Sequence, residues 1–218
     1  MRGLRLIATG GALCAAALLA SAASAGVGLS DNFDASTPDV LNWAGDATFT
    51  STTPASNLPN PASVDLIGAG GIYDFYPGHG SYVDLDGSSG NGNLPDAGQL
   101  TSVATFGPGS YTLTFDLGGN ARGAPAQTTV VSLGAFSAPI TLHSGDPYGL
   151  QPFNFFTATG GSLVFTDNGP SDQQGNILDN VTLTAVPEPA TWAMMLIGIG
   201  ALGGMLRGSR RKQAFATA

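Results

Sequence analysis

Cysteine is nearly absent from this chain of 218 residues, which contains only Cys14. This residue lies in an apolar N-terminal run that we expect to be removed from the mature protein. A mature chain without thiols cannot form disulfides, hold zinc through thiolates or use a cysteine nucleophile. Its stability must therefore come from an apolar core, with or without bound ions.

Lysine and glutamate are also missing from the central segment, residues 26–186, and arginine is nearly so. This segment holds fourteen aspartates, no glutamate and no lysine, and Arg122 is its only base, so its net charge is −13. Without a basic patch, nucleic-acid binding is excluded and binding to anionic lipid is disfavoured. The only histidines, His79 and His143, lie in no nucleophile or metal motif. We therefore expect that the protein is not an enzyme.

The first 25 residues have the pattern of a secretory signal peptide with a signal helix. Arg2 and Arg5 precede an apolar run over residues 6–20. Ala23-Ser24-Ala25 then matches an A-x-A cleavage site, which would leave Gly26 as the new N-terminus. The chain is therefore expected to be exported.

A second apolar run, Ala190–Leu206, lies near the C-terminus. Its seventeen uncharged residues would span roughly 25 Å as a helix, close to the bilayer core of about 30 Å. Trp192 stands where an aromatic belt residue belongs. Four basic residues follow as a membrane-stop signal: Arg207, Arg210, Arg211 and Lys212. We predict a transmembrane helix over 190–206, with residues 213–218 in the cytoplasm.

The residues around this run match a known sorting signal. Pro187-Glu188-Pro189, then Trp192 and Ala193, a Gly-rich apolar run and an Arg cluster resemble the PEP-CTERM sorting signal in its PEPxxWA form, over residues 186–212. This resemblance implies a temporary inner-membrane anchor, processing by an exosortase-type enzyme, and delivery to the cell surface or extracellular space. An ordinary single-pass C-terminal anchor is the alternative.

Residues 26–185 have the composition of strands and turns. Good helix formers are scarce, and short apolar alternations are bounded by Gly, Pro, Asn or Asp. The predicted strands lie near Asp46–Ser51, Ser63–Ile67, Ser81–Leu85, Gln99–Phe106, Ser110–Leu117, Thr128–Leu133, Ile140–His143, Phe153–Thr157, Ser162–Thr166 and Ile177–Ala185. Many short strands without a helical period predict an all-β fold, an antiparallel β-sandwich. Gly160-Gly161 predicts a hairpin between two of them.

Three stretches of this segment resemble another family. Ser81–Gly87, Gly109–Asn120 and Gly175–Leu183 are similar to motifs of the galactose-binding-like jelly rolls, which include plant cell-wall domains and many secreted bacterial proteins. The resemblance covers most of residues 30–185. It implies a jelly-roll fold but no particular activity.

Two acidic regions are candidate calcium sites. The loop Asp84–Asp96 is rich in the oxygen ligands that calcium prefers, but its spacing does not fit an EF-hand, so we favour a solvated loop. Relatives of the jelly-roll fold often carry a structural calcium between their first and last strands. The resemblance implies four ligands there: Asp31, Asn32, Asp34 and Asp179. The alternative is that Asp179 accepts backbone N–H bonds at a strand end.

Aromatic residues are candidate contacts for a glycan. If the segment Ile72–His79 is a strand, Asp74 and Tyr76 lie on one face, as a hydrogen-bond acceptor beside a stacking ring. The further candidate contacts are Trp43, Tyr73, Tyr82 and Tyr148. The alternative is that these rings pack in the core or hold loops in place.

The predicted function follows mainly from the predicted destination. An exported, acidic β-sandwich with this tail favours a structural or adhesive protein of exopolysaccharide or biofilm. The alternative is a carbohydrate-binding module, and an enzyme acting on polysaccharide is a third, weaker hypothesis. The predicted partners are the exosortase-type enzyme, the inner membrane and an exopolysaccharide.

Overall fold

The computed structural model describes residues 27–52, 64–88, 98–170, 172–187, 193–204 and 207. Several predicted residues lie outside these ranges: Ala23, Ala25 and Gly26 at the signal cleavage site, and Glu188, Pro189, Trp192, Arg210, Arg211 and Lys212 in the tail. The chain divides into two compact units, one of residues 24–188 and one of residues 1–23 with 189–218.

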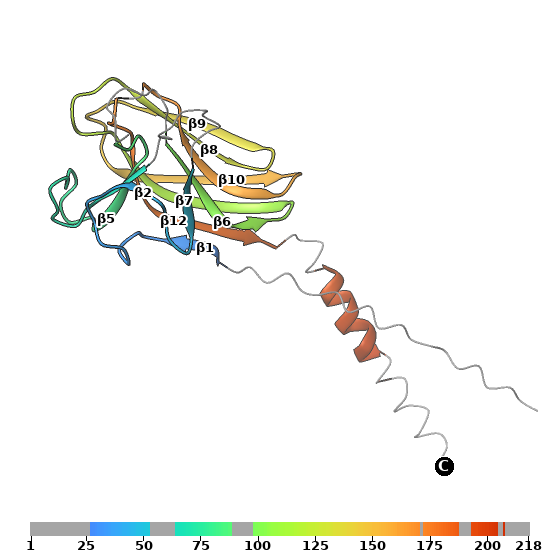
Figure 1. The fold of residues 1–218 in the computed structure, drawn as a ribbon. Coiled ribbons are helices and arrows are strands. Elements are labelled where there is room, and N and C mark those ends of the chain that lie inside the picture. The colour runs from blue at the N-terminus through green and yellow to red at the C-terminus, as the bar shows by residue number, and fades with distance from the viewer. Residues whose placement is uncertain are drawn as a thin grey trace, which may run out of the picture. The chain divides into compact units, whose positions relative to one another are not determined.

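The described part of the first unit is built from strands. They are β1 (Val27–Asp31), β2 (Val40–Trp43), β3 (Phe49–Thr52), β4 (Val64–Gly68), β5 (Ser81–Asp84), β6 (Gln99–Phe106), β7 (Gly109–Gly118), β8 (Gln127–Leu133), β9 (Phe136–Leu142), β10 (Gly149–Thr157), β11 (Gly161–Asp167) and β12 (Ile177–Val186). These strands form two antiparallel sheets (Figure 1). One has seven strands in the order β10-β7-β12-β5-β4-β2, with β1 also paired to β12, and the other has five in the order β3-β6-β11-β8-β9. The predicted all-β antiparallel sandwich is confirmed.

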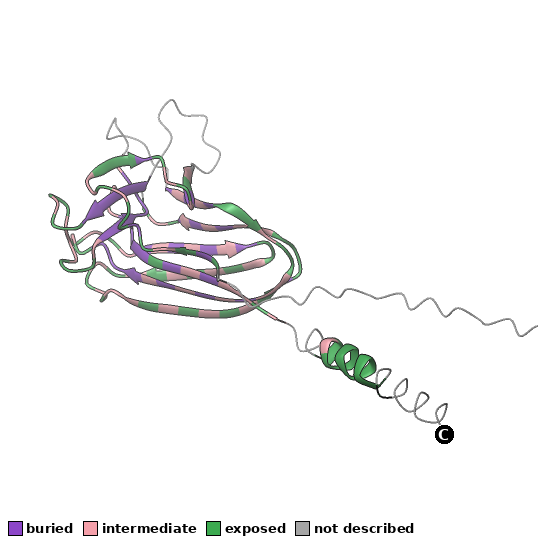
Figure 2. Ribbon diagram, turned by 90° about the horizontal axis from the view of Figure 1, so that it is seen from below, coloured by how far each residue is buried: buried purple, intermediate pink, exposed green. Residues whose placement is uncertain are grey.

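The core lies between the two sheets. Along β7, Tyr111, Leu113, Phe115 and Leu117 are buried while the residues between them are partly exposed, as the alternation predicts. Phe115 meets Phe165 of β11 edge-to-face, with ring centroids 5.0 Å apart, so this contact joins the sheets. Figure 2 shows buried residues alternating with more exposed ones along several strands of the sandwich.

Four strands differ from the sequence prediction. Neither β1 nor β2 was predicted, because each is only four or five residues long and has no clear alternation. Strand β9 begins at Phe136 rather than Ile140, and β10 begins at Gly149 rather than Phe153. Both strands contain a proline in the part that was missed. Since β9 and β10 each form the edge of a sheet, they tolerate a residue without an N–H.

The predicted hairpin at Gly160-Gly161 is wrong. Strand β10 pairs with β7 in the seven-stranded sheet, whereas β11 pairs with β6 and β8 in the five-stranded sheet. The short connection therefore crosses from one sheet to the other. Gly160 is required by close packing, because a Cβ there would overlap the carbonyl oxygen of Phe106.

The loop between β4 and β5 folds over the outer face of the seven-stranded sheet. Its residues 69–80 form turns and bends rather than the strand considered for Ile72–His79. Tyr82 of β5 is fully buried beneath it, and its hydroxyl accepts the N–H groups of Phe75 (2.5 Å) and Tyr76 (2.9 Å). The same hydroxyl donates to Asp74 Oδ1 at 3.0 Å. One side chain thus fixes the position of this loop.

The described part of the second unit is a helix over residues 193–204, which includes Ala193. Its large apolar side chains are exposed: Met194, Leu196, Ile197, Ile199 and Leu202. Within the described residues, no helix has the length and apolar character needed to cross a membrane.

Candidate functional site

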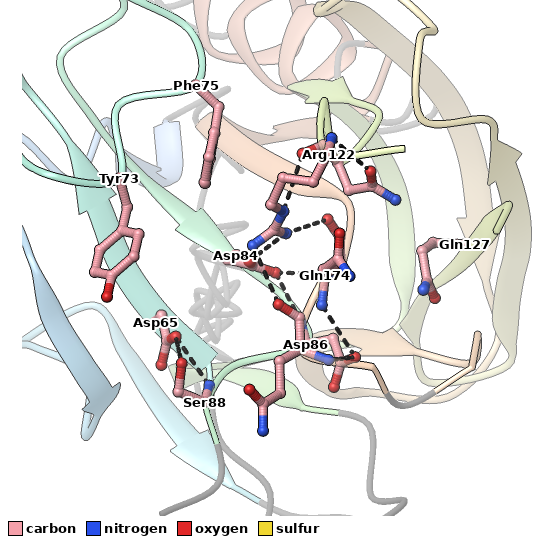
Figure 3. A network of polar contacts seen from close by, with 12 residues as sticks. Asp65, Tyr73, Phe75, Asp84, Asp86, Ser88, Arg122, Gln127 and Gln174 are labelled. Atoms are coloured by element: carbon pink, nitrogen blue, oxygen red, sulfur yellow. Dashed lines mark hydrogen bonds and ion pairs between the residues drawn. The ribbon is translucent and has the colours of Figure 1, made fainter. Parts of the chain in front are cut away.

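A cleft of about 290 Å³ lies on the outer face of the seven-stranded sheet. Asp65 and Ile67 of β4 line it, together with Asp84 of β5. Asp84 lies directly opposite Asp65 where β4 and β5 pair. Tyr73 and Phe75 of the loop over this face also line the cleft. The loops that hold Arg122 and residues 172–174 complete it. Figure 3 shows Asp65, Tyr73, Phe75, Arg122 and Gln174 around Asp84.

Arg122 ties the walls of the cleft together. Its Nε donates to the carbonyl of Asn120 (3.1 Å), one terminal nitrogen donates to the carbonyl of Gln173 (3.1 Å), and the other forms an ion pair with Asp84 at 2.6 Å. Its guanidinium carbon lies 4.7 Å from the centre of the Phe75 ring, a cation–π contact. Arg122 therefore holds three segments in place, and most of its donors are already used.

Asp84 is the buried partner of this arginine, with 1% of its surface exposed. Its Oδ1 accepts the N–H groups of Gly175 (2.8 Å) and Asp86 (3.1 Å). Burial raises the pKa of Asp84, and the charge of Arg122 is the largest influence in the opposite direction and favours the ionised carboxylate. The carboxyl is thus an internal anchor for the arginine rather than a group that reaches a ligand.

Two further carboxylates hold the rim of the cleft. Asp86 Oδ2 accepts the N–H groups of three successive residues, 172–174, at 2.8, 2.7 and 3.4 Å. Asp65 accepts the N–H of Asn42 through Oδ1 (2.7 Å), and the N–H and hydroxyl of Ser88 through Oδ2 (2.9 and 2.8 Å). Because these bonds are internal, they fix the shape of the cleft before any ligand arrives.

Two polar side chains of the cleft remain available to a ligand. The Tyr73 hydroxyl and the side-chain amide of Gln174 have no hydrogen-bond partner among the described residues. Tyr73 is also 39% exposed, so its ring offers an apolar face at the entrance. The cleft therefore combines one exposed aromatic ring with two free hydrogen-bonding groups.

The residues predicted to contact a glycan have structural roles instead. Trp43 is wrong as a contact, because it is only 5% exposed and its ring meets Phe33 edge-to-face in the core. Asp74 accepts the N–H of Gly70 as well as the Tyr82 hydroxyl, and the Tyr76 hydroxyl donates to the carbonyl of Gly119 at 2.7 Å. Asp74 and Tyr76 thus use these groups to hold loops together, as the alternative interpretation had it.

The predicted calcium ligands make hydrogen bonds and close contacts of their own, and Asp34 lies near enough to Asp179 to raise the pKa of its carboxyl. Asp31 lies beside Thr48 and Asp46, whereas Asp34 accepts the N–H of Ser81 (2.8 Å) and the side-chain N–H of Asn32 (2.8 Å). Across the described ranges, no group of three or more Asp, Glu, His or Cys residues is positioned to hold a metal. The calcium site predicted from these four residues stays a prediction.

Asp179 instead matches the alternative interpretation. Its Oδ1 accepts the N–H of Asn180 at 2.6 Å, and the hydroxyl of Tyr148 lies beside its carboxyl. Burial raises the pKa of Asp179 to about 7. In the loop Asp84–Asp96, residues 89–97 lie outside the described ranges, and Asp84 and Asp86 have the internal roles given above.

Sequence reasoning missed Arg122 and Gln174. Arg122 carries a signal that could have identified it, since it is the only base among fourteen acids in residues 26–186. A lone arginine in such a segment is expected to pair with a carboxylate, because a buried acid needs a counter-charge or several donors. Gln174 carries no such signal, because its place in the cleft depends on how Asp86 holds its loop.

Comparison with known proteins identifies the tail. The profile of the PEP-CTERM protein-sorting motif matches residues 185–212, which confirms the resemblance seen in the sequence. No curated protein matches the chain significantly.

Solved structures resemble the sandwich in fold. The K3 cleaved adhesin domain of Lys-gingipain from Porphyromonas gingivalis superposes with a TM-score of 0.50 at 15% identity, over 75% of this chain and 100% of that domain. The K1 cleaved adhesin domain of the same protein gives 0.49 at 16% identity, over 72% and 98%. The CBM22-1 xylan-binding domain of Paenibacillus barcinonensis Xyn10C gives 0.44 at 14% identity, over 76% and 97%. Identities this low show the fold alone.

The two units of the chain therefore have separate assignments. The first is a jelly-roll β-sandwich, as the three motif stretches indicated. The second includes most of the matched sorting motif, which implies export and processing by an exosortase-type enzyme. The chain thus carries a PEP-CTERM protein-sorting motif behind a β-sandwich domain.

Proposed function

We propose that the sandwich is a non-catalytic glycan-binding module, which attaches the protein to exopolysaccharide at the cell surface or in the extracellular matrix. The observation that carries this proposal is the cleft, where the exposed ring of Tyr73 stands with the free amide of Gln174. Ligand sites are typically concave, lined by aromatic side chains and equipped with a few polar groups.

The geometry of the cleft supports a small, preorganised site. Its volume of about 290 Å³ is at the low end for ligand pockets, about 300–1,000 Å³, so we expect it to hold one sugar unit of a longer chain. The ring of Tyr73 would cover the apolar face of the sugar, and Gln174 would exchange hydrogen bonds with its hydroxyls. Because Arg122 already fixes the walls, binding would require little ordering of the protein.

The test of this proposal is glycan binding by a fragment of residues 26–188. This fragment contains every buried apolar residue of the described chain. On a glycan array we expect saturable binding that Tyr73→Ala and Gln174→Ala each weaken at least tenfold. Phe156→Ala is the matched control, since Phe156 is 61% exposed on the edge strand β10 and does not line the cleft. An array without binding would contradict the proposal and favour a structural matrix protein.

We further propose the processing route that the tail predicts. The signal peptide, residues 1–25, is removed during export, and residues 190–206 hold the precursor in the inner membrane. The exosortase-type enzyme then cleaves near Pro187-Glu188-Pro189, which follows directly on β12. The measurement is the intact mass of surface protein. Mature protein that retains residues 192–218 would establish a plain membrane anchor instead.

A further inference from the structure

A second polar cluster is buried between the two sheets. Asp167 is the last residue of β11, and it lies opposite Thr129 of β8. Gln127 begins β8, and Asn176 immediately precedes β12 of the other sheet. All four side chains are at most 1% exposed. The cluster thus joins the five-stranded sheet to the start of β12.

The amide nitrogens of this cluster all have partners. Asn176 Nδ2 donates to Thr129 Oγ1 (3.0 Å) and to the carbonyl of Gln127 (3.2 Å). Gln127 Nε2 donates to the carbonyl of Pro170 (3.1 Å) and to Asp172 Oδ1 (3.2 Å). Turning either amide around would place its oxygen against a carbonyl oxygen, so the network fixes both orientations.

Four side-chain oxygens of the cluster make no hydrogen bond of normal geometry to any described residue. Gln127 Oε1, Asn176 Oδ1 and both carboxyl oxygens of Asp167 are buried and have no hydrogen-bond partner among the described residues. Unpaired buried acceptors are costly, and a buried carboxylate costs more than an amide. Asp86 and Asp172 lie close enough to Asp167 to add to the negative potential there. The site therefore lacks positive charge.

Two of these groups border the same glycine. A Cβ at Gly169 would overlap Gln127 Oε1, so this oxygen lies against the glycine backbone. The N–H of Gly169 also lies near the Asp167 carboxyl and lowers its pKa, although burial has the larger effect and raises that pKa to about 7. Asn176, next to β12 of the other sheet, also lies close to Asp167. Its side chain donates to Thr129 Oγ1, and Thr129 is the residue opposite Asp167 where β8 and β11 pair.

We propose that a calcium ion binds at this cluster, with the carboxylate of Asp167 and the side-chain oxygens of Gln127 and Asn176 among its ligands. Calcium takes six to eight oxygen ligands in flexible geometry and accepts carboxylate and amide oxygens together. Magnesium fits less well, because it requires near-octahedral geometry and keeps several waters. A set of one carboxylate and two amides also agrees with the lack of any metal-binding acidic trio in the described chain.

The proposed ion has a structural role. It would link β8 and β11 to the start of β12, and so join the two sheets at one end of the core. It would also stabilise the positions of Pro170 and Asp172, because Gln127 bonds both residues. Extracellular calcium modules bind with dissociation constants of about 10⁻⁴–10⁻³ M. A site of that strength would fill after export and would stabilise the sandwich outside the cell.

The test uses the full chain, purified in mild detergent and stripped with EDTA. We expect calcium to raise the melting temperature saturably and equilibrium dialysis to find one ion per chain, with a much smaller effect of magnesium at equal concentration. Asp167→Asn should abolish the calcium-dependent shift. Asp179→Asn is the matched control, since Asp179 is also a 1% exposed carboxyl but belongs to the position first predicted from the sequence. It should keep the shift.

A third variant covers the case in which Asp167→Asn does not fold. Gln127→Glu adds a carboxylate to the same cluster, so it should lower the calcium concentration at half-saturation by about tenfold and lower the melting temperature in EDTA. No calcium-dependent shift in the wild-type protein would overturn the proposal. A shift that Asp167→Asn retains, or that Asp179→Asn removes, would overturn it as well.

Discussion

Replacement of Arg122 gives the sharpest test of how the cleft is held together. Methionine keeps much of the length of the side chain but removes the charge and all five N–H donors. The variant leaves Asp84 in place with two backbone N–H groups and no ion-pair partner. It also leaves the carbonyls of Asn120 and Gln173 without this donor. The domain should therefore lose stability.

The size of the loss can be worked out from burial. Removing one partner of a buried ion pair typically costs about 3–5 kcal/mol. The side chain of Asp84 is 2% exposed and that of Arg122 is 19% exposed, so we expect the lower end of this range, about 3 kcal/mol. For a domain of this size, each kcal/mol shifts the melting temperature by roughly 2–4 °C. The expected fall is therefore about 6–12 °C.

The assay is urea unfolding of the 26–188 fragment in a double-mutant cycle. Arg122→Met, Asp84→Asn and the double variant are compared at one pH. Since asparagine can still accept the N–H of Gly175 but carries no charge, the double variant should be at least about 1 kcal/mol more stable than additivity predicts. If Arg122→Met costs less than about 1 kcal/mol, or if the two changes add, Arg122 does not hold the cleft through Asp84.

Three further changes test other parts of the structure. Tyr82→Phe removes the hydroxyl that holds the 69–80 loop, so limited proteolysis should cut this loop faster, while the fold remains; an unchanged rate would contradict this role. Phe115→Ala should cost about 3–5 kcal/mol in urea unfolding, against less than about 0.5 kcal/mol for exposed Phe156→Ala. Burial, with Asp34 and Asp116 nearby, raises the pKa of Asp179 to about 7. The stability that this raised pKa contributes is complete below the pKa of Asp179 in the unfolded chain, about 3.9. It is lost as pH rises through about 7, the pKa in the folded protein. The melting temperature should thus fall between pH 5 and pH 8, and less steeply in Asp179→Asn.

The sequence could predict the strands because their signal is local. The alternation of apolar and polar residues in β7 predicts which side chains face inward, and those side chains are buried in the structure. The sheet that each strand joins is not a local property. The turn at Gly160 is tight enough for a hairpin, yet it connects strands of different sheets. Turn residues fix local geometry, whereas sheet membership depends on packing across the whole core.

The sequence was least able to predict which aromatic side chains are exposed and which are buried. Trp43 is buried because Phe33 packs against it, and Phe33 takes a left-handed backbone conformation with φ of 55°. That conformation is unusual for a bulky residue, and the N–H bond from Phe33 to Asp31 Oδ1 (2.8 Å) supports it. No pattern of apolar residues in the sequence predicts such a backbone conformation. Tyr73 is exposed for an equally non-local reason, since Tyr82 holds the backbone of its loop.

The charge balance of the exported part connects the cleft with the proposed calcium site. Arg122 is the only basic side chain among fourteen aspartates, and it is committed to Asp84. The buried Asp65 and Asp86 are satisfied by N–H and hydroxyl donors. Asp167 has no base beside it, and its carboxyl oxygens make no hydrogen bond of normal geometry among the described residues, although the N–H groups of Asn168 and Gly169 lie near. Because residues 26–186 contain no second base, no basic side chain of this segment can supply a counter-charge for Asp167, and the calcium ion proposed above would supply it.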